Sequence, residues 1–172
     1  MFLELIATVI AGFACAGIMM LVNRLVGRHL PRWLTPVAAG LGMFGVTIAN
    51  EYSWYDRTSA RLPDGLEIAL TVEEKSWFRP WTQLHPYIKR FVAVDTATAQ
   101  TNENLPDQRL INLYFFGRWS PVNEAPMLVD CAEARSAVLI DGVTFGEDGS
   151  VTDADWQSMA PDDPVLKLAC ET

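Results

Sequence analysis

The stretch Trp33–Asn50, WLTPVAAGLGMFGVTIAN, has eighteen consecutive residues without a charge and is flanked by Arg32 and Glu51. As a helix rising about 1.5 Å per residue it would be about 27 Å long, close to the hydrocarbon thickness of a bilayer. A second uncharged stretch of eighteen residues, Leu5–Val22, LIATVIAGFACAGIMMLV, precedes it. The two stretches predict a transmembrane helical hairpin over residues 1–56, with spans at about 5–22 and 33–50.

The loop between the predicted spans, residues 23–32, sets the expected topology. It contains Arg24, Arg28 and Arg32, whereas no Lys or Arg precedes the first span. Short loops rich in arginine stay on the cytoplasmic side. We therefore expect an inner-membrane protein of a bacterium with both termini in the periplasm. A cleaved signal peptide is the alternative for residues 1–22, but the missing positive charge before the apolar stretch disfavours it.

Residues 57–172 have a different character and predict a periplasmic, mostly antiparallel β domain with short C-terminal helices. Residues 51–172 carry 20 acidic and 10 basic residues, whereas residues 1–50 carry a net charge of +2. So acidic a domain repels nucleic acid and anionic lipid, which excludes a nucleic-acid-binding function. The predicted fold class is therefore a membrane-anchored α+β protein.

Strand patterns organise the β domain. Residues 66–72 alternate apolar and polar side chains, and residues 110–116, LINLYFF, are apolar on both faces, as in a central strand. We expect further strands at 91–95 and 127–131 and within 137–145. The polar segment 96–107 predicts a loop, and 117–126, with its two prolines, predicts a turn. Two helices should close the chain, one after Thr152 and one after Asp163-Pro164.

Small residues recur at intervals of four in the predicted second span. These are Ala38 with Gly42, and Gly45 with Ala49. Small faces let helix backbones approach closely in lipid, where packing drives association. The pattern fits two alternatives equally: the two helices pack on each other, or one face docks on a helix of another protein.

Several aromatic residues follow the second span, and they have two interpretations. Trp54 is expected at the outer membrane interface, where tryptophan is enriched. Trp77, Phe78 and Trp81 lie in a segment with two prolines, which is neither a regular helix nor a central strand. They either complete the core of the β domain or contact a partner or the membrane interface.

Cys131 and Cys170 are the only cysteines of residues 57–172, since the third, Cys15, lies in the first span. An even pair in an oxidising compartment predicts a disulfide. Two free buried thiols are the alternative if the topology is inverted.

We find no nucleophile elbow, phosphate-binding loop, dinucleotide fingerprint or paired-histidine zinc motif. His85 is the only histidine of residues 57–172, so we expect no enzyme, no metal and no cofactor. The acids Glu147, Asp148, Asp153 and Asp155 are explained as turn and helix-cap residues rather than as a calcium site.

These features predict a non-catalytic accessory subunit or assembly factor of a larger inner-membrane complex, such as a respiratory or photosynthetic one. Its expected partners are integral membrane subunits and the lipid bilayer. The alternative is a membrane-anchored periplasmic binding or sensor module with transient partners and a pocket near Trp77 and Trp81.

Overall fold

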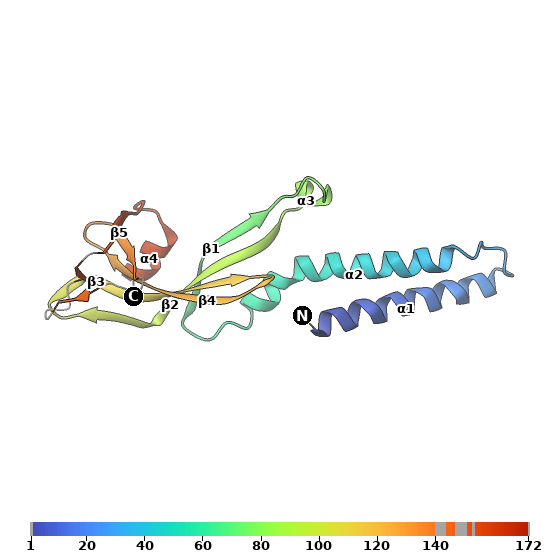
Figure 1. The fold of residues 1–172 in the computed structure, drawn as a ribbon, viewed down its shortest axis with the longest axis horizontal. Helices are drawn as coiled ribbons and strands as arrows, with labels where there is room; N and C mark the ends of the chain where they lie inside the picture. Colours follow the sequence, from blue (N-terminus) through green and yellow to red (C-terminus); the bar gives the residue numbers. More distant parts are fainter. Residues whose placement is uncertain (1, 140–143, 147–150, 153, 172) are drawn as a thin grey trace. The chain divides into compact units, whose positions relative to one another are not determined.

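The computed structural model describes residues 2–139, 144–146, 151, 152 and 154–171 (Figure 1). The chain divides into two compact units, Met1–Arg57 and Thr58–Thr172, which we call the helical unit and the β unit. The helices are α1 (Phe2–Leu25), α2 (Leu34–Ser59), α3 (Trp81–Leu84) and α4 (Pro164–Glu171). The strands are β1 (Leu66–Glu74), β2 (Tyr87–Asn102), β3 (Leu105–Gly117), β4 (Ser120–Asp130), β5 (Arg135–Val138), β6 (Thr144–Phe145), β7 (Val151–Thr152) and β8 (Gln157–Ser158).

The helical unit consists of α1 and α2, joined by a short loop. Near one end of the pair the Arg57 guanidinium lies 3.2 Å from the Glu4 carboxylate. Among the described residues only α1 is long and apolar enough to cross a membrane. The prediction of two such spans is therefore supported for the first alone. Helix α2 begins at Leu34. Its mean hydropathy is lowered by Pro36, by threonines and glycines, and by the charged residues from Glu51 onward.

The β unit is a curled antiparallel sheet of six strands in the order β1-β2-β3-β4-β5-β8 (Figure 1). The first four strands follow one another as hairpins, so each pairs with its neighbour in sequence. The apolar stretch 110–116 lies in β3, between β2 and β4, which confirms its prediction as a central strand. The alternating stretch 66–72 lies in β1, at the sheet edge.

Two segments predicted as irregular are strands. Residues 96–107 extend β2 and β3 into a longer hairpin, with Asp95 absorbing a register shift by accepting the N–H groups of Ala97 and Thr98. The turn predicted over 117–126 is confined to two residues, and β4 starts at Ser120. Pro121 is tolerated because β4 pairs with β5 only from Met127 onward, so β3 is its one neighbouring strand. Pro126 meets the chain after β5 through its carbonyl, which accepts the Leu139 N–H at 2.9 Å.

The core lies where α4 packs on the sheet. Its buried members are Val94, Ile111, Leu113 and Val129 of the sheet with Leu166 and Ala169 of α4. The described residues after Thr152 contain no helix before α4, since Val151–Thr152 pairs with β6 and Gln157–Ser158 pairs with β5. In this part of the chain the structure thus describes one C-terminal helix rather than the two predicted.

Candidate functional site

Close packing between α1 and α2 depends on two glycines. A side chain at Gly12 would overlap with Met43 of α2. A side chain at Gly42 would overlap with the Cys15 Sγ and lie 3.3 Å from the Ala11 carbonyl oxygen. One alternative left by the sequence is thus realised, because part of the small-residue pattern packs the two helices on each other.

The rest of that pattern points elsewhere. Ala38 is half-buried like Gly42, whereas Gly45 and Ala49 are exposed. A Cβ built at Gly45 has nothing within 4 Å outside its own helix. Helix α2 therefore presents a second small face that α1 does not cover.

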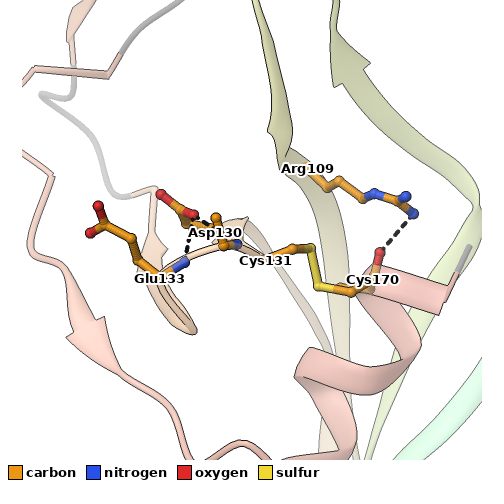
Figure 2. Close-up of a disulfide and its surroundings, with 7 residues drawn as sticks. Arg109, Asp130, Cys131, Glu133 and Cys170 are labelled. Carbon is orange, nitrogen blue, oxygen red and sulfur yellow. Dashed lines mark hydrogen bonds between the residues drawn. A yellow bond between two sulfur atoms is a disulfide. The ribbon is translucent and has the colours of Figure 1, made fainter.

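A disulfide joins Cys131, which follows β4, to Cys170 of α4, as the sequence predicts (Figure 2). Their Cα atoms are 5.9 Å apart, and the link closes a sequence separation of 39 residues. Beside it the Arg109 guanidinium of β3 donates a hydrogen bond of 3.0 Å to the Ala169 carbonyl. The C-terminal helix is thus held by a covalent bond, a charge-assisted hydrogen bond and apolar packing.

Asp130, one residue before the disulfide, is the most densely bonded acid of this region and was missed by the sequence analysis. Its carboxylate accepts the N–H groups of Ala132 and Glu133, at 3.2 and 3.1 Å, and two bonds from the Arg135 guanidinium, at 3.2 and 3.0 Å. Burial raises the pKa of Asp130. The hydrogen bonds from Glu133 and Arg135, the Arg135 charge and a bond from Gln108 outweigh this effect, so the pKa lies below its ordinary value.

Replacing Asp130 with Asn is expected to lower the free energy of unfolding of the β unit by about 1–3 kcal/mol at neutral pH, because Arg135 loses its buried partner. A lowered folded-state pKa contributes stability that is present above the unfolded value, about 3.9, and lost as the pH falls through the folded value. The difference between the two proteins should therefore begin to shrink below about pH 4 and disappear only below the folded-state pKa of Asp130. Urea unfolding of both proteins across this pH range measures it. Asp155→Asn, at an exposed acid, serves as the control.

The loop between β1 and β2 is a folded tip built around Thr82, whose side chain is fully buried. The Thr82 hydroxyl accepts the Ser76 N–H at 2.9 Å and donates to the Arg79 carbonyl at 2.8 Å. Trp77 and Phe78 lie between these anchor points, and their rings meet edge to face at 6.1 Å. The tip is therefore fixed from inside while its two aromatic residues are exposed.

The remaining aromatic candidates are less exposed. Trp81, in the first turn of α3, is half-buried, and so is Trp54 on α2. His85 is exposed directly after α3, and its backbone N–H donates to the Trp81 carbonyl. The structure thus assigns the four sequence candidates different environments, with Trp77 and Phe78 the most accessible.

A further exposed aromatic residue at the same end of the sheet was not predicted from the sequence. Trp119 lies in the two-residue turn between β3 and β4, with the Arg118 guanidinium 5.1 Å from its ring. The backbone N–H of Arg118 donates to the Lys89 carbonyl, so this turn lies beside the start of β2, the strand that follows the tip. Only the strand register brings the two segments together.

An open groove of about 590 Å³ runs over β1 to β4 and is lined by apolar residues such as Val72, Val92 and Phe115. Neither Trp77 nor Trp81 lines it, so it is a different feature from the pocket predicted near these residues.

No family model, curated protein or solved structure matches this chain.

Within the described ranges no group of three or more His, Cys, Asp or Glu side chains is placed to hold a metal ion. Glu147, Asp148 and Asp153 lie outside these ranges. Asp163 accepts the Val165 N–H at 2.8 Å and so acts as a cap of α4, the role expected from the sequence.

Proposed function

We propose that this protein is a non-catalytic accessory subunit or assembly factor of a larger bacterial inner-membrane complex, such as a respiratory or photosynthetic one. Helix α1 anchors the chain, α2 accompanies it through the bilayer, and the β unit lies in the periplasm. The observation that carries the proposal is the uncovered small face of α2 at Gly45 and Ala49.

The physical basis is the way helices associate in lipid. Lipid tails are as apolar as leucine side chains, so a helix gains by docking only where backbones approach closely. Contact with α1 already occupies Gly42, whereas Gly45 borders the exposed side chains Leu41 and Phe44. A small residue between larger ones offers a recess into which a side chain of another helix can fit.

The disulfide supports the periplasmic location of the β unit. Disulfides persist in oxidising compartments and are rare in the bacterial cytoplasm. The arginine-rich loop between α1 and α2 favours the cytoplasmic side, which places the following unit on the opposite side if α2 crosses.

Gly45→Leu is the test of helix docking. A leucine there fills the recess, so we expect co-purification of partner subunits from native membranes in mild detergent to fall at least tenfold. Gly40→Leu is the matched control, because Gly40 also has open space around it but lies on another side of α2. Unchanged recovery of a fixed set of partners with Gly45→Leu would refute this part of the proposal.

A membrane-anchored binding or sensor module is the second candidate, and the groove over β1 to β4 is the observation in its favour. This function predicts that the protein elutes alone from native membranes. An accessory subunit instead elutes with partners in constant proportion.

A further inference from the structure

One end of the sheet in the β unit combines exposed aromatic and apolar side chains. Trp77 is 88% exposed, Phe78 63% and Leu84 81%, and all three lie on the tip between β1 and β2. Trp119 of the neighbouring turn is 61% exposed. Large apolar side chains gathered at such exposure mark an interaction surface.

Basic residues are concentrated at the same end of the sheet, where Glu73 and Glu74 of β1 are the neighbouring acids. Residues 75–94 contain four basic residues and no acid, although residues 51–172 carry a net charge of −10. Lys75 and Arg90 are exposed. The half-buried Arg79 guanidinium lies 5.7 Å from the Phe78 ring, and Lys89 is paired with Glu74 of β1. Charge is thus segregated along the unit, with the cations placed around the exposed aromatic residues.

We propose that this tip docks into the headgroup region of an anionic lipid bilayer. Tryptophan prefers the membrane interface, where its apolar ring and its N–H group are both accommodated. Nearby lysine and arginine side chains are attracted by anionic headgroups, by about fivefold in binding for each cation near the surface. Trp77, Phe78 and Leu84 enter the interface while Lys75 and Arg79 reach the phosphates.

The construction of the tip favours a membrane over a protein partner. Figure 1 shows α3 at the far end of the β1–β2 hairpin, and Trp77 and Phe78 of this end are 88% and 63% exposed. Thr82 holds the tip from inside, and docking therefore requires little ordering of the backbone. Protein hot spots instead occupy well-packed pockets surrounded by a rim that excludes water.

Acidic charge elsewhere in the unit sets the orientation of docking. The net negative charge repels anionic lipid from most of the surface, whereas residues 75–94, with four cations and no acid, form a stretch that anionic lipid attracts. The net charge of the β unit predicts repulsion from anionic lipid, but the uneven distribution of charge allows the tip to bind it.

A depth-sensitive fluorophore on the full-length protein tests this inference. A nitrobenzoxadiazole label is attached at Gln83→Cys in a Cys15→Ser background. The protein is then reconstituted in vesicles of phosphatidylcholine alone or of phosphatidylcholine with about 30% anionic phosphatidylglycerol. We expect blue-shifted emission and quenching by spin-labelled lipid in the anionic vesicles. A label at Asn104→Cys, in the turn at the opposite end of the sheet, should show at most a third of this quenching.

Two pairs of substitutions separate the contributions. Trp77→Ser with Phe78→Ser should reduce quenching at position 83 to the level of position 104. Lys75→Gln with Arg79→Gln should lower the docking equilibrium about 25-fold in anionic vesicles, from about fivefold for each cation. Lys167→Gln on α4 is the control for charge and should change nothing.

Absence of quenching at position 83 in both kinds of vesicle would overturn the inference. Equal quenching in neutral and anionic vesicles would overturn the part of the inference that assigns a role to anionic headgroups. Protection of the label only after native membrane proteins are added would identify the tip as a protein-binding surface instead. None of these results depends on Gly45, so they are separable from the test of helix docking.

Discussion

Loss of the Cys131–Cys170 disulfide should lower the free energy of unfolding of the β unit by about 4 kcal/mol. The estimate follows from the sequence separation of 39 residues, because a cross-link of that span removes conformational entropy from the unfolded chain. The disulfide also holds α4 on the sheet in the folded protein. Helix α4 has 8 residues, too few to be stable alone, and it supplies Leu166 and Ala169 to the core.

The measurement is urea unfolding of the full-length protein in detergent, comparing wild type with Cys131→Ser/Cys170→Ser. Reduction of the wild-type protein should give the same destabilisation as the double substitution. Cys15→Ser leaves the β unit intact and should show no change in its unfolding. If the double variant unfolds at the same urea concentration as wild type, the link does not stabilise the unit.

The disulfide also reports the compartment. In native membranes under non-reducing conditions, we expect a polyethylene-glycol maleimide to leave Cys131 and Cys170 unmodified until a reductant is added. Modification of both thiols in unreduced, denatured protein would place the β unit in a reducing compartment and contradict the proposed topology.

Local patterns were sufficient where one physical effect dominates. The alternation over 66–72 correctly predicts a strand, although Leu70 and Val72 are exposed rather than buried. The apolar stretch 110–116 correctly predicts a strand with neighbours on both sides, although Phe115 is 40% exposed. Asp163 before Pro164 specifies a helix start through an acceptor and a fixed φ. The cysteine pair followed from parity and compartment.

Longer-range pairing explains what the sequence could not predict. Residues 96–107 look like a loop, yet the segment contains threonines, which favour strands, and it pairs once β3 lies alongside. Pro121 is harmless because β5 does not extend beside it, and Pro126 because the chain after β5 bonds to its carbonyl. Trp119 joins the tip through the register between β2 and β3, and Thr82 acts through bonds to residues three and six positions earlier.

The helix pair offers the second large effect, through Gly42→Leu. A side chain at this position overlaps with Cys15 and lies 3.3 Å from the Ala11 carbonyl oxygen of α1, so the close contact between the helices is disturbed. Overpacking of this kind costs about 1–3 kcal/mol, which corresponds to an opening of the pair about 5- to 150-fold more frequent. Gly45→Leu should leave the pair closed, because a side chain there has open space.

Cys15 is a natural reporter of that opening, because it is the free cysteine of this chain and lies against Gly42. With Cys131 and Cys170 oxidised, a fluorogenic maleimide in detergent reports the rate at which Cys15 becomes accessible. We expect labelling at least fivefold faster in Gly42→Leu, and wild-type rates in Gly40→Leu and Gly45→Leu. If Gly45→Leu keeps Cys15 protected but the protein no longer co-purifies with partner subunits, contact between α1 and α2 is distinguished from contact with a helix of another protein. Equal labelling rates in Gly42→Leu and wild type would instead show that the pair does not depend on this close approach.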